Sequence, residues 1–549
     1  MLEKFCVGLV RILLGGILFF LTLLSAVVTC RVYGGSEIVQ YGRDSLFLHL
    51  FFGAGVIGLT VFYRRRKERK CRKNQWLLLA AAAYLFWILL VPSWGGSDSH
   101  QCMASAQGLL QGDFSAWDPV AYSYGTAEGP LGYAYTYPSQ NGLILYMAVL
   151  AFFFGDAAYV VFQILNIGFF ILGIVSLQRM TVRGNERCSL LLWMACCLPF
   201  SFYILFVYGT MPGFGLSCLA MERLVRYVEE GRGRDFWIGA AAVAAAVILK
   251  SNYEIVLVAL FLYLASSGVF RRKARLLVAA VLLITVYVIG NRGIQTGISS
   301  VTGRTVSDGA PMIAWVQMGL EESKRGPGWY NGYQVKLFQK ADGDADLAAA
   351  WAQADLRKTI SDMAEEPAKA ADFFVRKIES IWAEPTFQSL WIQEVGNTSW
   401  AEGSPPWELF KEEGGLNRLY VFAANLLQTF VYAMACVWVI AGMSAKGSRS
   451  KHVLMKRTWE KRIEAEKTVK AVKKQGMETV WERQERGEPD RWGMLLPGIV
   501  FIGGFLFHLV WEAKGQYSVV YFMLLLPYAY LGMERVADVF LDVTGAGKE

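Results

Sequence analysis

The amino-acid sequence predicts an all-α protein that crosses a membrane about 12 times. Hydrophobic residues make up 54% of the 549 residues and charged residues only 18%, whereas a soluble chain carries about a quarter charged residues. Apolar runs recur along most of the chain, and many reach the roughly 20 residues that a helix needs to cross a bilayer. The composition therefore excludes a soluble globular protein.

The expected spanning segments are separated by short polar or basic stretches. They are 6–29, 44–63, 76–94, 157–179, 188–208, 210–226, 236–250, 252–268, 276–290, 416–442, 493–510 and 517–533. The first segment is long for a signal peptide and lacks a small-residue cleavage site, so we expect it to be retained. The apolar segment 141–154 is too short to span comfortably and is expected to be a re-entrant or interfacial helix.

The net charge of +8 comes from basic clusters that lie between apolar runs. These clusters are 64–73, 179–187, 223–234, 270–275 and 445–492. All of them share one side of the membrane if 141–154 does not cross, and by the positive-inside rule that side is the cytoplasm. Both termini then lie in the cytoplasm, and a bacterial plasma membrane fits this pattern. Since the charge reports topology, no nucleic-acid partner is expected.

The same pattern divides the chain into regions. They are 1–94 with the first transmembrane helices, 95–156 as an outward loop with juxtamembrane helices, 157–290 as a transmembrane core, 291–415 as an outward polar and helical region, 416–442 as one transmembrane helix, 443–492 as a charged cytoplasmic helical insertion, and 493–549 as a transmembrane pair with a tail. The insertion mixes both charge signs at helical spacing, which is typical of a solvated helix.

The cysteines and histidines give little sign of metal chemistry. Of nine cysteines, most lie in or beside apolar runs, and no CxxC pair occurs. We interpret them as small hydrophobic residues. The histidines are few and scattered, so no metal ligands are assigned, although a divalent metal stays possible.

Asp98 is the principal candidate for catalysis. It follows the third expected span in SWGGSDSH, and its simpler interpretation is a cap on the helix expected at 99–112. His100, Asp113, Asp118 and Glu128 lie in the same outward loop. Aromatic rings of the kind that stack on sugars surround it in sequence; they are Trp94, Trp117, Tyr122, Tyr124, Tyr133, Tyr135 and Tyr137. An acid beside such rings fits a general base that takes a proton from a sugar-accepting hydroxyl. His100, Asp118, Tyr137 and Gln140 are assigned to substrate binding.

A second polar set lies between the last two spans. His508, Glu512, Lys514, Gln516 and Tyr517 fall within ten residues on the outward side. Ionisable residues at such positions are functional candidates, and Lys514 would neutralise the phosphate of a lipid-linked donor. The simpler interpretation is a short loop with a snorkelling lysine. Glu512, Lys514, Gln516 and Tyr517 are assigned to substrate binding.

A third set interrupts two apolar runs in ILKSNYEI, also on the outward side. Lys250, Tyr253 and Glu254 are assigned to substrate binding, while a pair between Lys250 and Glu254 across one helical turn is equally expected. Arg292, just after the next span, is a further cation for the same phosphate. The outward region 291–415 contains a solvated helix pair, a Gly-rich and aromatic loop at 319–333, and a formal glycosylation sequon at 397–399.

These segments together resemble the C-type membrane glycosyltransferases, in particular the bacterial family 39-like proteins related to protein O-mannosyltransferases. The resemblance is carried by Asp98 after a span, GDFSAWDP, YTYPSQNGLILYMAVLAFFFGD, VFQILNIGFF, KSNYEI and FLFHLVWEAKGQYSVVYFMLLLPYAYLG. It implies that Asp98 is the catalytic base, that 99–112 and 141–154 are juxtamembrane helices, and that Lys514 contacts phosphate. The donor would be a polyprenyl-phosphate sugar.

The chain departs from that family in three respects. Two additional spans precede the acidic residue, no second acid lies directly beside Asp98, and the insertion 445–492 has no counterpart that we can match. The missing acid pair leaves metal dependence open.

We therefore expect a glycosyltransferase that transfers a sugar from a polyprenyl-phosphate donor to a cell-envelope glycan, teichoic acid or protein at the outer face of the membrane. No nucleotide-sugar motif is visible, which favours a lipid-linked donor. A transporter or flippase for lipid-linked saccharides is the alternative, but such proteins place sites near the midplane and show repeats. A polymerase or ligase that uses the same lipids shares nearly every prediction.

Overall fold

The computed structural model describes residues 2–33, 37–65, 73–91, 96–123, 129–181, 188–396, 400–412, 414–443 and 492–543. The expected insertion 443–492 falls almost wholly outside these residues, as do Trp94, Tyr124, Glu128 and the sequon 397–399. Nearly all of the described chain is helical, so the all-α class is confirmed.

The helices have the following bounds in chain order: α1 (Leu2–Val27), α2 (Leu46–Arg65), α3 (Lys73–Leu90), α4 (Ser97–Gln111), α5 (Tyr133–Thr136), α6 (Asn141–Phe154), α7 (Ala158–Thr181), α8 (Cys188–Ala195), α9 (Leu198–Ser201), α10 (Thr210–Glu230), α11 (Gly233–Leu249), α12 (Glu254–Arg271), α13 (Ala274–Thr302), α14 (Met312–Gly319), α15 (Tyr333–Lys340), α16 (Ala345–Glu365), α17 (Pro367–Trp382), α18 (Trp391–Gly396), α19 (Pro405–Phe410), α20 (Gly415–Ala441), α23 (Leu496–Val510) and α24 (Gly515–Val543).

Eight helical segments of the described chain are long and apolar enough to cross a membrane, or nine if a bent pair is counted as one. The eight are Leu2–Val27, Leu46–Arg64, Pro138–Thr181, Ser251–Arg271, Ala274–Thr302, Gly415–Ala441, Gly493–Val510 and Gly515–Val543. The protein is therefore a polytopic membrane protein, while the expected number of about 12 spans is not confirmed. α3 and α11 also run alongside the bundle, but the apolar part of each is shorter than any of these eight segments.

The largest departure from expectation lies in 188–208, which we expected to be one span. The structure breaks this segment into α8, α9 and a 3₁₀ turn (Phe202–Leu205), and the chain then turns by 118° into α10. Pro199 lies at the start of α9, where it cannot donate a backbone hydrogen bond to the preceding turn. The break therefore has a local cause in the sequence.

The segment 141–154 forms α6, which a three-residue turn joins to α7. Together they make an apolar stretch of 44 residues, about twice the length of one crossing. α6 packs closely on α11, because a Cβ at Gly142 would overlap the carbonyl oxygen of Ile248. Phe152 and Phe153 at its end are 70% exposed, which suits a helix whose surface meets lipid.

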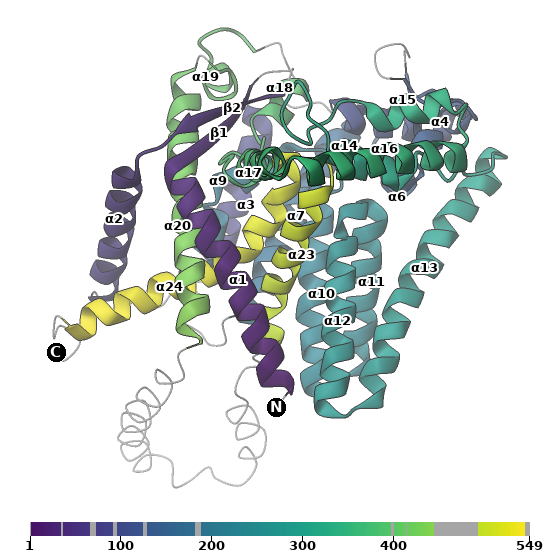
Figure 1. Ribbon diagram of the computed structural model, residues 1–549. Helices are drawn as coiled ribbons and strands as arrows, with labels where there is room; N and C mark the ends of the chain where they lie inside the picture. The colour runs from purple at the N-terminus through teal and green to yellow at the C-terminus, as the bar shows by residue number, and fades with distance from the viewer. Residues whose placement is uncertain are drawn as a thin grey trace.

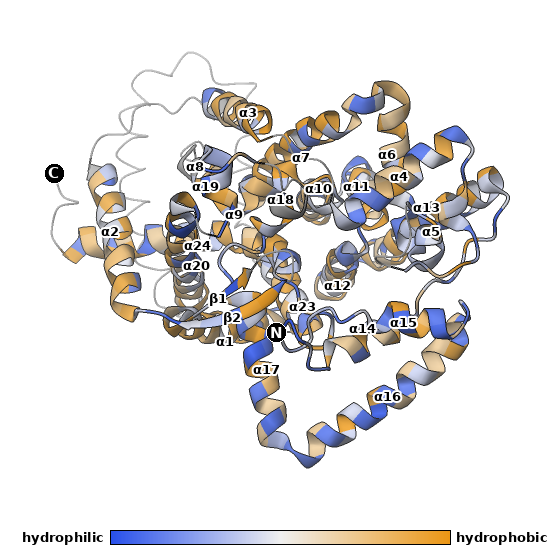
Figure 2. Ribbon diagram, turned by 90° about the horizontal axis from the view of Figure 1, so that it is seen from above, coloured by the Kyte–Doolittle hydropathy of each residue, from blue (hydrophilic) through white to orange (hydrophobic). Residues whose placement is uncertain are grey.

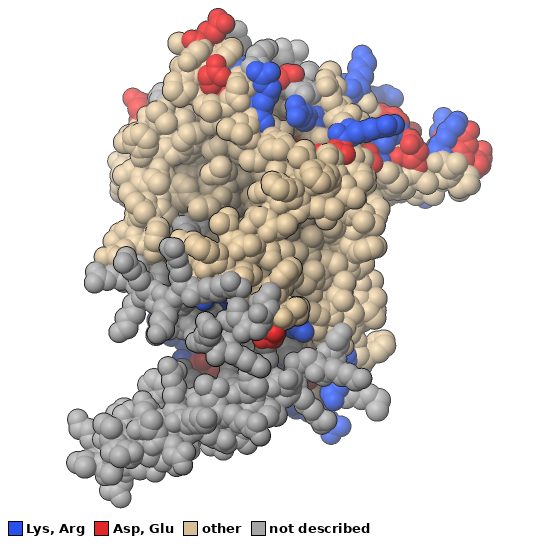
Figure 3. All heavy atoms as spheres, turned by 90° about the vertical axis from the view of Figure 1, so that its left-hand side faces the viewer, with Lys and Arg blue, Asp and Glu red and all other residues tan. Residues whose placement is uncertain are grey.

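The long helices run side by side between two ends of the molecule (Figure 1). The N-terminus and the end of α24 lie toward one end, whereas α4, α6 and α14 to α17 lie at the other. Seen from that second end, α16 and α17 extend away from the bundle as two arms (Figure 2). On the face in Figure 3, charged side chains gather toward the two ends and leave a band of other residues between them. We call the end that carries α4 and α14 to α17 the upper end.

An antiparallel hairpin, for which the apolar pattern made no prediction, joins α1 to α2. Strands β1 (Val28–Tyr33) and β2 (Ile38–Arg43) pair with Val28 opposite Arg43 and Tyr33 opposite Ile38. The hairpin is fixed at the upper end by two backbone hydrogen bonds. Cys30 N–H donates to the Ala383 carbonyl (2.8 Å) and Val39 N–H donates to the Arg325 carbonyl (2.9 Å).

The close contact between α20 and α24 depends on Gly532, where a Cβ would overlap the carbonyl oxygen of Met434. We expect Gly532→Ala to lower the free energy of unfolding by about 1–3 kcal/mol, the usual cost of overpacking. Thermal unfolding in detergent measures the change. Gly16→Ala in α1 is the matched control, since nothing lies within 4 Å of its Cβ; equal melting temperatures for both variants would contradict this account of the contact.

Candidate functional site

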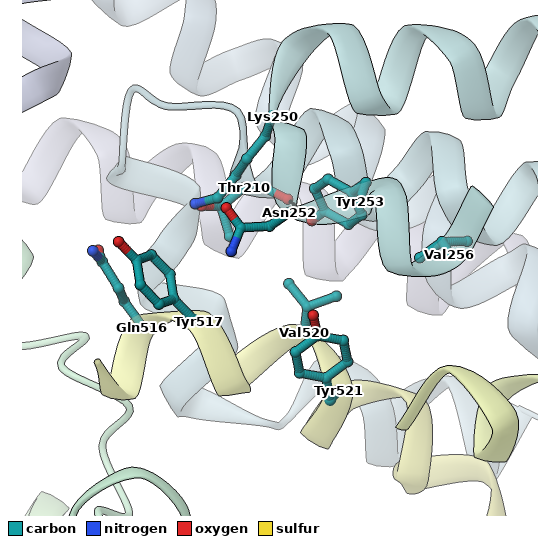
Figure 4. Close-up of a pocket in the computed structure, with 9 residues that line it drawn as sticks. All are labelled: Thr210, Lys250, Asn252, Tyr253, Val256, Gln516, Tyr517, Val520 and Tyr521. Carbon is teal, nitrogen blue, oxygen red and sulfur yellow. Dashed lines mark hydrogen bonds between the residues drawn. The ribbon is translucent and has the colours of Figure 1, made fainter. Parts of the chain in front are cut away.

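Four separate segments bring ionisable side chains together at the upper end. They are the start of α4, the hairpin, the turn between α11 and α12, and the link between α23 and α24. A pocket lies between the last two, lined by Thr210, Lys250, Asn252, Tyr253, Val256, Gln516, Tyr517, Val520 and Tyr521 (Figure 4). Its cavity volume of about 10 Å³ leaves room for about one water molecule, so these side chains are closely packed in this structure.

Lys250 caps the C-terminus of α11 and is buried in this pocket. Its ammonium donates to the Thr210 hydroxyl (2.9 Å) and lies over the rings of Tyr208 (4.6 Å) and Tyr517 (5.7 Å). Burial, aided by the positive charge of Lys514, lowers its pKa to about 7. The expected pair with Glu254 does not form, because the Glu254 carboxylate accepts instead from the Tyr287 hydroxyl (2.9 Å). Within the described part of the chain, the direct hydrogen-bond partner of Lys250 is therefore a hydroxyl.

The link between α23 and α24 carries Glu512 and Lys514. It is held extended by Ala513, whose N–H donates to the Gly328 carbonyl (2.7 Å). Burial raises the pKa of Glu512 to about 7, and the nearby carboxylates of Glu37 and Asp98 add to this rise while Lys514 opposes it. Burial alone would lower the pKa of Lys514, but the surrounding carboxylates raise it on balance.

Glu37, in the turn of the hairpin, is a member of the site that the sequence analysis missed. Its carboxylate accepts from Lys514 Nζ (3.2 Å), from Gln388 Nε2 (3.1 Å) and from the Arg325 guanidinium. Lys514 also lies over the Trp391 ring at 4.7 Å. Nothing local in YGGSE distinguishes this acid from a surface residue, since its three partners come from distant segments.

Asp98 lies in the first turn of α4 and is half-buried. The helix cap is Gly96 and no side chain caps this end, so the simpler interpretation of Asp98 as the cap is wrong. The charge of Asp98 adds to the rise in the pKa of Glu512 and of Lys514, and it partly opposes the fall in the pKa of Lys250. The structure thus brings Asp98 together with both later polar sets.

Gln140, Tyr253 and Gln516 are further predicted substrate-binding residues, and hydrogen bonds between uncharged groups connect them to the same region. Gln140 donates from Nε2 to the Tyr208 hydroxyl (2.5 Å), next to Lys250. The Tyr253 hydroxyl donates to the Thr210 carbonyl. The backbone N–H of Gln516 donates to Gln388 Oε1 (3.2 Å), which connects α24 to the partner of Glu37.

The remaining candidates lie elsewhere in the structure. His100 is exposed two residues along α4 from Asp98, a separation that turns the two side chains to different faces. Asp118 pairs with Arg304 (2.8 Å) near the surface. Arg292 is exposed on α13, which extends well beyond the expected span 276–290. His100 and Asp118 were assigned to the site because they share the outward loop with Asp98, and Arg292 because it follows a span on the outward side.

The aromatic residues of the 95–156 loop divide into two groups. Trp117, Tyr122 and Tyr133 are nearly fully buried, and Trp117 donates to Asn141 Oδ1 (2.9 Å), so they form core and not a sugar platform. Tyr137 is half-buried and meets Trp315 of α14 edge-on at 6.2 Å. Trp315 in turn lies parallel to Trp511 at 6.1 Å, beside Glu512. Tyr137, Trp315 and Trp511 therefore form a row of partly exposed rings that ends beside Glu512.

Two buried ionisable groups, Lys377 and Glu384, hydrogen-bond to the backbone of segments that carry or adjoin site residues. Lys377 of α17 donates to the carbonyls of Leu509 (3.1 Å), Trp511 (2.8 Å) and Gly319, and burial lowers its pKa to about 7. Glu384 accepts from the backbone N–H groups of Thr386 (2.9 Å) and Gln388 (2.6 Å), and burial raises its pKa to about 7. Glu384 thereby orients the segment that presents Gln388 to Glu37.

The fold and the site define a polytopic helical membrane protein whose ionisable residues meet at one end of the bundle. Comparison of the chain with protein-family models, with curated proteins and with solved structures finds no match. Among the described residues, no group of three or more His, Cys, Asp or Glu side chains is arranged to hold a metal ion.

Glu384 makes stability depend on pH in a defined direction. Its pKa rises from 4.5 in the unfolded chain to about 7 in the folded protein, so the folded state binds the proton more tightly. This contribution is complete below pH 4.5 and is lost as the pH rises toward 7. We expect Glu384→Gln to reduce the fall in melting temperature of the detergent-solubilised protein between pH 5 and about 7.

Lys377→Met provides the comparison of opposite sign. The pKa of Lys377 falls from 10.5 to about 7 on folding, so the stability that it contributes grows as the pH rises from about 7 toward 10.5. The methionine variant should lose this alkaline increase and keep the acid slope. If both variants retained the wild-type profile, the buried positions of the two groups would be contradicted.

Proposed function

We propose that the protein is a membrane glycosyltransferase that transfers a sugar from a polyprenyl-phosphate donor to a hydroxyl of a cell-envelope acceptor. The observation that carries this proposal is the convergence of Asp98 with Lys250, Glu512 and Lys514 at the upper end. In the proposal the upper end faces outward from a bacterial plasma membrane, and both termini are cytoplasmic. The resemblance of the loop and of the terminal segment to family 39-like enzymes supports the same activity.

The proposed reaction gives Asp98 the role of general base and Lys250 that of stabilising the leaving group. The acceptor hydroxyl oxygen forms a bond to the anomeric carbon of the sugar, and its proton passes to Asp98. The bond between the anomeric carbon and the phosphate oxygen breaks, and its electron pair leaves with the polyprenyl phosphate. Lys250 stabilises the negative charge that develops on that oxygen. It suits this task because, among the residues that the structure describes, its direct hydrogen-bond partner is the Thr210 hydroxyl.

The partly exposed aromatic rings support a saccharide as the transferred group. Trp315 and Trp511 lie in parallel planes, with an angle of 1° between them, and Tyr137 meets the first of them. Large rings offer an apolar face with a polar edge, which matches the alternating C–H and O–H surface of a pyranose. In the proposal these rings hold the sugar beside Glu512.

A transporter for lipid-linked saccharides is the second candidate, and one observation favours it. The helix break before α10, bent by 118°, ends at Thr210, which bonds Lys250 in the pocket. Broken helices beside a binding site are typical of transporters. A transporter would move the labelled lipid between leaflets of a vesicle without forming a new glycosidic bond, so product analysis separates the two candidates.

Asp98→Asn tests the assignment of the base. Removal of a general base should lower turnover by about 100-fold or more, measured with a radiolabelled polyprenyl-phosphate hexose and acceptor membranes. Asp113→Asn is the control, because Asp113 is exposed in the same loop and its carboxylate accepts from Ser115 of that loop, with 2.9 Å to the backbone N–H. Wild-type turnover in Asp98→Asn would remove the proposed base.

Lys250→Met tests the contact to the leaving group. Loss of a charge-assisted contact to phosphate should reduce kcat/KM for the lipid-linked donor by about tenfold or more. The same substitution at Lys340 is the control, since that lysine lies over the Trp351 ring (4.9 Å) away from the site. An equal effect of both substitutions would count against a specific contact at Lys250.

A further inference from the structure

Glu37 is held by a set of donors that is unusual for one carboxylate. An ammonium, a guanidinium and a side-chain amide converge on its two oxygens: Lys514 and Gln388 on Oε1, at 3.2 Å and 3.1 Å, and Arg325 on Oε2. The side chain is only 4% exposed. These donors come from three segments far apart in the chain, so the fold assembles them around a single point.

Glu37 presents this carboxylate from the turn of the hairpin, in a strained backbone conformation. Its φ of 53° lies in the left-handed region, which a residue with a Cβ adopts at a cost of about 1 kcal/mol or more. The hairpin thus accepts local strain, which its contacts with Lys514, Arg325 and Gln388 offset.

We propose that Lys514, Arg325 and Gln388 form a phosphate-binding site, that Glu37 occupies it in this structure, and that a bound phosphate displaces Glu37. Two cations and an amide around one oxyanion are the donor types that bind phosphate in proteins. A carboxylate presents two of the oxygens that a phosphate would present, and can therefore stand in its place. The hairpin then acts as an internal competitor for the ligand.

The position of this site fits a phosphate that is attached to a larger substrate. Lys514 belongs to the link beside the pocket, and its charge acts on Lys250. The Trp391 ring contacts one side of the Lys514 ammonium. Glu37 contacts the same ammonium, and in the proposal it is the partner that the phosphate replaces. The choice of a prenyl phosphate as ligand rests on the proposed function, whereas the anion site itself stands on the donors around Glu37.

The charge balance explains why displacement is required. With Glu37 in place, the cations of Lys514 and Arg325 are both already paired with its carboxylate. A phosphate brought beside that carboxylate would add a second anion to the same buried point, which is unfavourable in a medium of low dielectric constant. When a phosphate replaces the Glu37 carboxylate, Lys514 and Arg325 each keep an anionic partner.

Equilibrium binding to the full-length protein in detergent tests the proposal. Glu37→Gln keeps the size of the side chain but removes the competing charge, and should tighten the binding of farnesyl phosphate by about tenfold. Lys514→Met should weaken it by at least as much. Glu366→Gln is the matched control, because Glu366 pairs with Lys369 at the exposed start of α17 and should leave affinity unchanged.

Inorganic phosphate distinguishes the source of the ligand. Competition by inorganic phosphate at similar concentrations would indicate a site for free phosphate, whereas a preference for farnesyl phosphate supports a lipid headgroup. Either outcome supports the anion site. Unchanged or weaker affinity in a folded Glu37→Gln variant would overturn it and leave Glu37 as a structural partner of Lys514.

The wild-type protein provides a second test that needs no variant. Displacement of Glu37 predicts faster hydrogen exchange in β1 and β2 when farnesyl phosphate binds. Unchanged or slower exchange there on binding would overturn the proposal. Asp98→Asn should still bind farnesyl phosphate, at least as tightly as the wild type, even if it is inactive, so failure of the anion site and failure of the proposed glycosyl transfer are separable.

Discussion

The buried ammonium of Lys377 is the contact on which the upper end of the protein depends. A charged or polar group removed from water is costly unless it is fully hydrogen-bonded, and the last carbonyls of a helix lack partners within that helix. Lys377 meets both needs at once, because it donates to Leu509 and Trp511 at the end of α23 and to Gly319 at the end of α14. The direction of the link that carries Glu512 and Lys514 follows from this contact.

From Lys377 the polar contacts continue as a chain through the interior. Glu384, at the end of the same helix, fixes the backbone at Gln388, and Gln388 contacts both Glu37 and the first turn of α24. Phe387 and Gln388 have positive φ angles, so this segment is held in place by its neighbours and not by local preference. Buried networks of this kind are sensitive to the loss of any member, which connects the supporting groups to the geometry at Lys514.

Much of the architecture could be predicted from apolar periodicity, and much of the site could not. Apolar runs of about 20 residues predict spans by their length. Asp98, Lys250 and Lys514 could be predicted as site residues because they are ionisable and lie directly beside such runs. Glu37, Lys377 and Glu384 gave no such signal, because each is an ordinary acid or base in a polar segment until the fold buries it. The break in 188–208 was missed since hydropathy averages over Pro199. His100 and Asp118 were included because closeness in sequence was taken for closeness in space.

The attachment of α2 has a consequence for the membrane that surrounds the protein. Only 6% of this span is buried, yet both of its ends are fixed: His49 contacts Asp44 (2.9 Å), which is bonded to Asn425 of α20, and Arg64 pairs with Glu534 (2.6 Å) and Asp538 (2.5 Å) of α24. A helix of 20 residues is about 30 Å long, equal to the hydrocarbon thickness of a typical bilayer. Contacts at both ends restrict the tilting by which a free helix adapts to mismatch, so α2 follows the orientation of α20 and α24 although most of its surface faces outward.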